Sequence, residues 1–263
     1  LSAEQTEASD TWYQGTADAV RQNLIHFDAN DDDVFVILSG DQLFRMDLEK
    51  FVRDHLASNA GVTVAAKPIP VADASGLGLL KVDANGSIVE FIEKPTDPEV
   101  LARLALTELN DAAGQSFCLA SMGIYAFGAK VLCKALASGQ ADFGKEIIPR
   151  LVGEVALRSH IFDDYWEDIG TVKAFFESNL RLVDSEPPFD FHDPDRAIFT
   201  YPISNLPSAK VETCSMERVI LTSGSLVGKA SLHRCIVGVR SVIGNDVNLN
   251  DVVLMGADYF EDK

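Results

Sequence analysis

The stretch Val34-Phe35-Val36-Ile37-Leu38-Ser39-Gly40-Asp41 decides the fold class of this 263-residue chain. Its first five residues form an uninterrupted apolar run, which is typical of a strand buried on both faces of a parallel sheet. Ligands of open α/β sheets bind at the carboxyl ends of such strands, so the carboxylate of Asp41 is a first candidate site residue. A lone Asp at this place is also common as a turn or cap residue.

Strands and helices alternate along the chain around this run. The Asn85-Gly86 pair, between alternating segments at 77–82 and 88–92, predicts a hairpin. Thr16 is the expected N-cap of the first helix, and Pro149 is expected to end a short helix over 143–149. Further helices are expected over 16–24, 47–58, 96–106, 129–137 and 171–182, and further strands over 62–66, 122–127 and 155–162. The alternation predicts an α/β domain with a mixed, mainly parallel sheet.

A different pattern follows Pro187-Pro188, where the helical period stops. Aliphatic residues then recur every six positions, a spacing typical of a left-handed parallel β-helix; a β-sandwich with chance spacing is the alternative. The series is Ile220, Leu226 and Leu232 and, after one slip, Val237, Ile243, Leu249 and Met255. We expect the α/β domain over 1–185, a linker over 186–210 and the β-helix over 211–263.

The composition limits the possible partners. The formal net charge of -18 repels nucleic-acid backbones and anionic membrane surfaces, so neither is an expected partner. No apolar run reaches the ~18 residues of a membrane span, and no signal peptide is evident. The four cysteines lack CxxC spacing, which favours a reduced compartment and disfavours a zinc site. Anionic substrates would need local cations or a metal to overcome the field.

Asp168 is the second candidate carboxylate, in the run Trp166-Glu167-Asp168-Ile169-Gly170-Thr171 between a strand and a helix that Thr171 could cap. Mg²⁺ takes one or two protein carboxylates and fills its other positions with phosphate oxygens and water. Asp41 and Asp168 together would meet that need and support phosphoryl-group chemistry. In the plainer interpretation, Asp168 only caps the helix that follows.

Two further segments carry candidate binding residues. In Phe91-Ile92-Glu93-Lys94-Pro95, Lys94 could hold a sugar phosphate and Glu93 could accept hydrogen bonds from sugar hydroxyls; an exposed ion pair is the commoner meaning of this dipeptide. In Gly15-Thr16, at the start of a helix, the missing side chain would let a flat base approach the backbone. A simple helix start explains the second segment equally well.

Taken together, these segments resemble ADP-glucose pyrophosphorylases over nearly the whole chain. Gly-Asp and Glu-Lys-Pro occur across sugar nucleotidylyltransferases, whereas the runs at 12–20 and 165–171 are more specific to the ADP-glucose branch. The matching runs are Trp12-Tyr13-Gln14-Gly15-Thr16-Ala17-Asp18-Ala19-Val20-Arg21, Leu38-Ser39-Gly40-Asp41, Phe91-Ile92-Glu93-Lys94-Pro95, Ser121-Met122-Gly123-Ile124-Tyr125, Asp142-Phe143-Gly144-Lys145-Glu146-Ile147-Ile148-Pro149, Tyr165-Trp166-Glu167-Asp168-Ile169-Gly170-Thr171, Cys235-Ile236-Val237-Gly238-Val239-Arg240-Ser241 and Met255-Gly256-Ala257-Asp258-Tyr259.

The resemblance implies a Rossmann-like nucleotidyltransferase domain and a reaction of ATP with glucose 1-phosphate that yields ADP-glucose and pyrophosphate, toward glycogen or starch. It implies that Asp41 and Asp168 are catalytic and hold Mg²⁺. The other implied roles are sugar-phosphate binding for Glu93, Lys94, Ser121 and Gly78, and nucleotide binding for Tyr13, Gly15 and Thr16. It also implies a homo- or hetero-tetramer, located in bacterial cytoplasm or in a plastid.

Two departures from the family pattern shape the remaining expectations. The Gly-rich phosphate loop with its Arg and Lys is absent, and so are the last β-helix turns, so the chain is expected to be a truncated piece that shows no turnover alone. Three alternatives stay open. They are another sugar-1-phosphate nucleotidylyltransferase using UTP, dTTP or GTP, a non-catalytic regulatory subunit, and an acyltransferase with His233 on the β-helix rim.

Overall fold

The computed structural model describes residues 12–106, 115–189, 191, 193, 194, 198 and 205–259. They fall into two compact units, residues 1–166 and 167–263, which are described one at a time below. Residues 1–11, residues 107–114 and much of the predicted linker lie outside the described residues.

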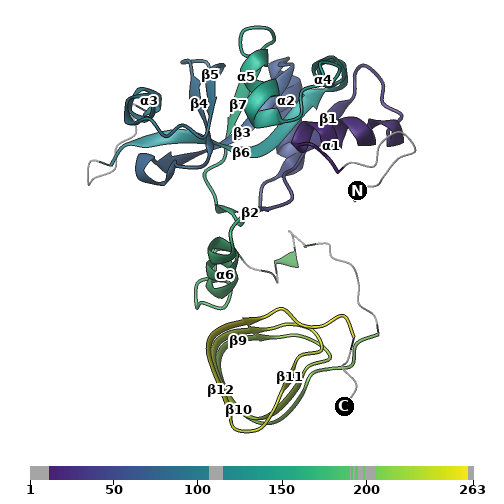
Figure 1. Ribbon diagram of the computed structural model, residues 1–263, viewed down its shortest axis with the longest axis vertical. Coiled ribbons are helices and arrows are strands. Elements are labelled where there is room, and N and C mark those ends of the chain that lie inside the picture. Colours follow the sequence, from purple (N-terminus) through teal and green to yellow (C-terminus); the bar gives the residue numbers. More distant parts are fainter. Residues whose placement is uncertain are drawn as a thin grey trace. The chain divides into compact units, whose positions relative to one another are not determined.

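The first unit is built on a six-stranded sheet in the order β5-β4-β6-β3-β7, with β1 paired to β6 (Figure 1). A separate two-stranded sheet joins β2 to β8, whose first residue, Trp166, ends the unit. The strands are β1 Val34–Ile37, β2 Gln42–Phe44, β3 Val62–Pro70, β4 Gly78–Val82, β5 Ile88–Glu93, β6 Phe117–Gly128, β7 Leu157–Ile161 and β8 Trp166–Asp168.

The expectation of a mixed sheet is confirmed, but the sheet is not mainly parallel. Among its described strand pairs, β3 with β7 is parallel, and β1 with β6, β3 with β6, β4 with β5 and β4 with β6 are antiparallel. The apolar run of β1 predicted burial on both faces, and its alternate residues do pack into two different cores, although all four keep partial exposure. An apolar run reports that both faces are covered; it carries no information on the direction of the neighbouring strand.

Helices cover both faces of the sheet and create two cores. One core packs α1, α4, η3 and α5 against one face through residues such as Ala17, Leu132, Phe143 and Ile148. The other packs α2 and α3 against the opposite face through Phe51 and Leu104. The helices are α1 Thr16–Asn23, η1 Leu24–His26, α2 Leu48–Ser58, η2 Val71–Asp73, α3 Pro98–Leu104, α4 Ala129–Leu136, η3 Phe143–Ile147 and α5 Ile148–Leu151.

Two predicted helix ends differ from the structure. Gly15 is the N-cap of α1, and Thr16 is its first residue, so the Thr16 hydroxyl is free to bond elsewhere. Pro149 does not end a helix; it lies in the first turn of α5, where its missing N–H costs nothing.

The second unit contains α6 Val172–Arg181 and a parallel stack of β9 Lys210–Leu221, β10 Leu226–Val237, β11 Val242–Ile243 and β12 Val247–Leu254. β10 pairs in parallel with β9, β11 and β12, as a β-helix requires, and Figure 1 shows the coils stacked on one another. Thr171 caps α6 as predicted, because its hydroxyl accepts from the backbone N–H of Ala174 at 3.1 Å.

The six-residue period locates part of the β-helix core and misses part of it. Leu232, Val237 and Ile243 are buried, as expected, whereas Leu226 and Met255 are 40% and 74% exposed. Val227 takes the inward position instead, since it lies opposite both Val211 and Ile243 in the ladder.

Among the described helices, none is both long enough and apolar enough to cross a membrane.

Candidate functional site

Asp41 follows β1 on an exposed turn and is held in one orientation. The Ser39 hydroxyl donates to its Oδ1 at 2.6 Å, and the Gln42 side-chain amide donates to the same oxygen at 3.3 Å. The Ser39 hydrogen bond is the main reason that the pKa of Asp41 lies below its ordinary value, and the charge of Lys94 lowers it further. Asp41 is therefore an ionised carboxylate with Oδ2 left over for a ligand.

An irregularity in the pairing of β6 with β3 lies next to the turn that carries Asp41. The β3–β6 register shifts between the pairs Val64 with Tyr125 and Ala66 with Ser121, and Gly123 adopts φ +68° within the shift. A Cβ added at Gly123 would lie 3.3 Å from the Cβ of Ser39. Glycine at this position thus lets β6 approach the residue that orients Asp41.

Glu93, at the end of β5, lies between two glycines. A Cβ at Gly78 would come within 2.6 Å of its Oε2, and a Cβ at Gly144 within 2.7 Å of the same oxygen. Gly78 is the register partner of Glu93 in β4, whereas Gly144 belongs to the one-turn π-helical segment η3. Such segments are frequent at functional sites. Because neither glycine has a side chain, the Glu93 carboxylate has room at this position.

The ionised form of Glu93 is disfavoured in this place. Its pKa is raised above the ordinary 4.5, chiefly by burial and also by the nearby charge of Asp142, while Lys94 and Lys145 act in the opposite direction. A half-buried carboxylate with a raised pKa is typical of a binding or catalytic group rather than of a stabilising ion pair.

We expect Glu93→Gln to unfold at higher urea concentration than the wild type at pH 7. Above pH 4.5 the unfolded chain loses a Glu93 proton that the folded protein still holds, so folding stability falls as pH rises through that window. Glutamine has no such proton, and its advantage should shrink at pH 4. Urea midpoints of both proteins at the two pH values test this; an advantage of equal size at pH 4 would refute it.

Lys94 joins the two carboxylates. It adopts φ +49°, an uncommon backbone conformation for a residue other than glycine, and its backbone N–H donates to the carbonyl of Leu77 at 3.1 Å. Its charge lowers the pKa of both Asp41 and Glu93, so the ammonium group is near enough to interact with each. A cation between two carboxylates can bind an anionic ligand there despite the acidity of the chain.

Ser121 and Tyr125 lie beside Glu93 on β6. Both are buried, and the Ser121 side chain hydrogen-bonds Tyr125. Burial raises the pKa of Tyr125 to about 12, and the charges of Glu93 and Asp142 contribute to the rise. The phenol is therefore neutral, and its hydroxyl interacts with the charge of the Glu93 carboxylate.

Gly15 and Thr16 belong to the same surroundings through the 141–143 segment. The Thr16 hydroxyl donates to Asp142 Oδ2 at 3.3 Å and accepts from the backbone N–H of Phe143 at 3.1 Å. A Cβ at Gly15 would come within 2.4 Å of the Ala141 carbonyl oxygen, so that glycine is needed for packing within the protein. Tyr13 is linked to α1 instead, since its hydroxyl accepts from Asn23 at 2.9 Å.

Asp168 ends β8 and lies in the second unit. Its Oδ1 accepts from the backbone N–H of Gly170 at 2.9 Å, so the described bonds of Asp168, like those of Asp41, use one oxygen and leave Oδ2. Each carboxylate thus fits a single magnesium position. Within the described residues no three His, Cys, Asp or Glu side chains cluster as a metal site. The sharing of one ion by Asp41 and Asp168 stays a prediction.

Comparison with known families gives the class of the protein. Residues 1–185 match the family model described as nucleotidyl transferase, which covers more than half of the chain, so the chain belongs to the nucleotidyl transferase family. Residues 204–263 match a second model, the GLGC left-handed parallel beta-helix domain. The two domains in this order fit the ADP-glucose pyrophosphorylase family.

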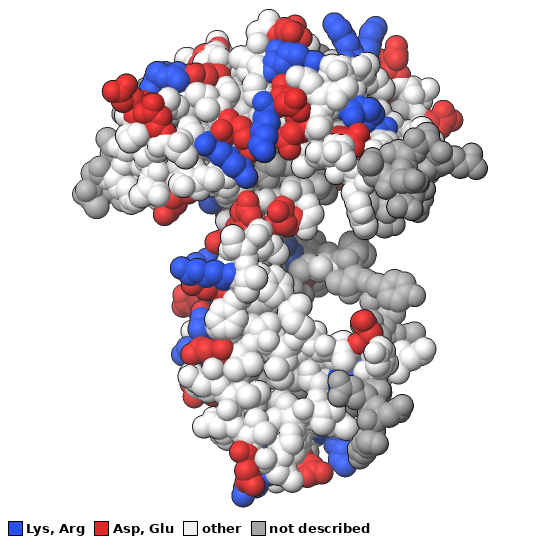
Figure 2. All heavy atoms as spheres, in the orientation of Figure 1, with Lys and Arg blue, Asp and Glu red and all other residues white. Residues whose placement is uncertain are grey.

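Reasoning from the sequence assigned no role to several residues of this site. Asp142 and Gly144 belong to a run quoted for the resemblance, and Tyr125 closes another, but neither composition nor spacing pointed to a function. Ser39 also went unassigned, although a hydroxyl two residues before a candidate carboxylate is a signal that could have been used. The face of the first unit drawn in Figure 2 carries both acidic and basic side chains.

Proposed function

We propose that this chain is a glucose-1-phosphate adenylyltransferase, which transfers the adenylyl group of ATP to glucose 1-phosphate and releases pyrophosphate. The observation that carries the proposal is the succession of a nucleotidyl transferase domain and a GLGC β-helix domain in one chain. The electrostatic coupling of Lys94 with Glu93 and Asp41 in the first unit supports it, because a cation suits a sugar phosphate and a carboxylate can accept from sugar hydroxyls.

The reaction needs charge stabilisation and positioning rather than covalent catalysis. An oxygen of the sugar phosphate forms a bond to the α-phosphorus of ATP, and the bond to the pyrophosphate oxygen breaks. In the proposal Lys94 neutralises the sugar phosphate, and Glu93 and the Tyr125 hydroxyl orient the sugar. Asp41 and Asp168 would hold Mg²⁺, which supplies charge neutralisation on the phosphates when bound.

The assembly is also a proposal. The β-helix exposes Leu226 and Val242, which are register partners on adjacent strands and are 40% and 69% exposed. Apolar neighbours of this kind suit a subunit contact, which supports the tetramer that the resemblance implies.

Nucleotide-sugar selectivity tests the proposed function. Calorimetric titration of the 263-residue chain in Mg²⁺ should give an affinity for ADP-glucose about tenfold or more above that for UDP-glucose, dTDP-glucose and GDP-glucose. Equal affinities, or a preference for another base, would replace adenylyl transfer by another sugar-1-phosphate nucleotidyl transfer. Glu93→Gln and Lys94→Gln should weaken all four ligands alike, since in the proposal Glu93 binds the sugar and Lys94 its phosphate, which all four ligands share.

A further inference from the structure

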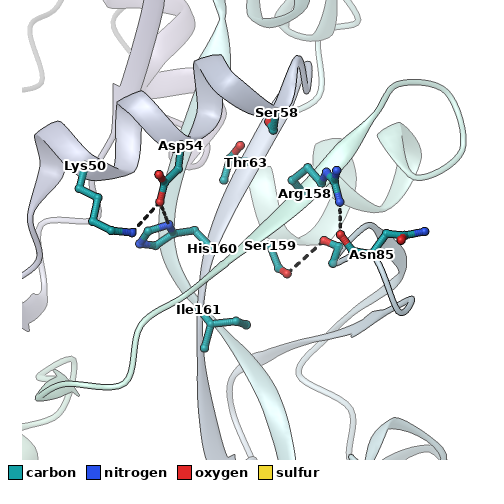
Figure 3. Close-up of a pocket in the computed structure, with 10 residues that line it drawn as sticks. Lys50, Asp54, Ser58, Thr63, Asn85, Arg158, Ser159, His160 and Ile161 are labelled. Carbon is teal, nitrogen blue, oxygen red and sulfur yellow. Dashed lines mark hydrogen bonds and ion pairs between the residues drawn. The ribbon is translucent and has the colours of Figure 1, made fainter.

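A polar cavity of about 340 Å³ opens on the first unit between α2, the start of β3, β7 and the turn that joins β4 to β5. Figure 3 shows side chains from these elements pointing toward one another around it. None of its lining residues belongs to the site described above. The cavity is therefore a separate feature of the same unit.

One oxygen of Asp54 is already engaged on one side of the cavity. Asp54 Oδ2 lies 2.8 Å from Lys50 Nζ and 3.3 Å from His160 Nδ1 (Figure 3). The Thr63 hydroxyl, at the floor, is bonded to the His55 ring nitrogen at 2.8 Å. Both contacts use Oδ2, so Asp54 Oδ1 is the carboxylate acceptor that the described bonds leave on this side.

Two backbone carbonyls on the other side of the cavity also accept hydrogen bonds. The Arg158 guanidinium donates through Nη1 to the carbonyl of Asn85, and the Ser159 hydroxyl donates to the carbonyl of Gly86 at 3.1 Å. Figure 3 shows Arg158 and Asn85 together at this end of the cavity.

What remains for a ligand is mainly donors. An ammonium group has three N–H donors and a guanidinium has five, and the described bonds use one of each. The side-chain amide of Asn85 adds two more donors and one acceptor oxygen, and no described bond uses them. Lys50 and Arg158 against Asp54 also give the lining a local net charge of +1, in a chain whose net charge is -18. A donor-rich, locally positive cavity selects a ligand made of oxygen acceptors with negative charge.

We propose that this cavity binds the phosphate group of a small phosphorylated metabolite. The Arg158 guanidinium would contact two phosphate oxygens. The Lys50 ammonium, which now pairs with Asp54, would also neutralise phosphate charge. The volume holds a compound larger than phosphate itself, and the Ser159 and Thr63 hydroxyls line the space between the two cations (Figure 3).

Titration of the ¹⁵N-labelled chain with inorganic phosphate, at constant ionic strength set with chloride, tests the site. Saturable shifts are expected at the backbone amides of Gly86 and Ser159 in the unaltered protein. The double variant Lys50→Gln, Arg158→Gln should bind phosphate about tenfold or more weakly. Its spectrum also reports whether it is folded, and the wild-type shifts test the site without any variant.

Two matched controls locate the effect. Lys173 pairs with Glu177 in the same i,i+4 arrangement as Lys50 with Asp54, so Lys173→Gln removes an equivalent charge elsewhere and should leave the affinity within about twofold. Lys94→Gln separates this cavity from the candidate sugar-phosphate site and should keep the Gly86 and Ser159 shifts. Absence of saturable shifts there, an unchanged affinity in the double variant, or their loss in Lys94→Gln would each overturn the proposal.

Discussion

Gly144→Ala is expected to weaken the binding of glucose 1-phosphate to this chain about tenfold or more. The new Cβ would lie 2.7 Å from Oε2 and 3.0 Å from Cδ of Glu93, closer than real Cβ contacts come. The atoms in the way are the end of the Glu93 side chain, so Glu93 is the group that has to shift. The carboxylate must therefore leave its place, and the hydrogen bonds proposed from the sugar hydroxyls are lost.

Calorimetry on the wild type and Gly144→Ala measures the effect, with Gly244→Ala as the control, because a Cβ at Gly244 meets nothing within 4 Å. Urea unfolding of each variant separates a loss of binding from a loss of folded protein. An affinity of Gly144→Ala within about twofold of the wild type would contradict the assignment of Glu93 as a sugar ligand.

Asp41→Asn is expected to reduce the affinity of the chain for Mn²⁺, used as a probe for Mg²⁺, about tenfold or more. The amide keeps an oxygen that can accept from the Ser39 hydroxyl, so the turn should stay intact while the negative charge disappears. A hard divalent cation binds a carboxylate oxygen far better than an amide oxygen because the carboxylate carries that charge. Water-proton relaxation measures the bound Mn²⁺ directly.

Asp83→Asn is the matched control for this variant. Asp83 is also a loop carboxylate with a lowered pKa, caused by backbone hydrogen bonds from Ser87 and Asn85, and an amide oxygen can replace it as acceptor. Both variants remove one unit of charge from the first unit. If they lower Mn²⁺ affinity equally, the effect of Asp41→Asn is a general field effect and the metal role of Asp41 is wrong.

Local sequence signals predicted the elements of this fold better than their partners. The Asn85-Gly86 pair correctly gave the β4–β5 hairpin, and Thr171 correctly capped α6. Turns and helix caps depend on a few neighbouring residues, so they can be predicted from the local sequence. The pairing of β1 with β6 joins segments about ninety positions apart, and the apolar run that predicted β1 is compatible with either strand direction.

The candidate site shows the same division. The Gly-Asp and Glu-Lys-Pro motifs predicted Asp41, Glu93 and Lys94 as site residues. The arrangement of these three side chains depends on long-range contacts. The space for Glu93 comes from Gly144 in a π-helical turn, and the orientation of Asp41 depends on Gly123 behind Ser39. Gly15 was expected to face a base, yet its missing side chain admits a carbonyl of the protein. Close approaches of this kind have no signature in residue type or spacing.

A double-mutant cycle on Mn²⁺ binding with Asp41→Asn and Asp168→Asn tests most directly whether two carboxylates, far apart in sequence, hold one divalent ion. If they share the ion, each single change should cost about tenfold or more, and the double variant should bind far more tightly than the product of the two losses requires. Strictly multiplicative losses, or an Asp168→Asn variant that binds Mn²⁺ as the wild type does, would contradict the shared site.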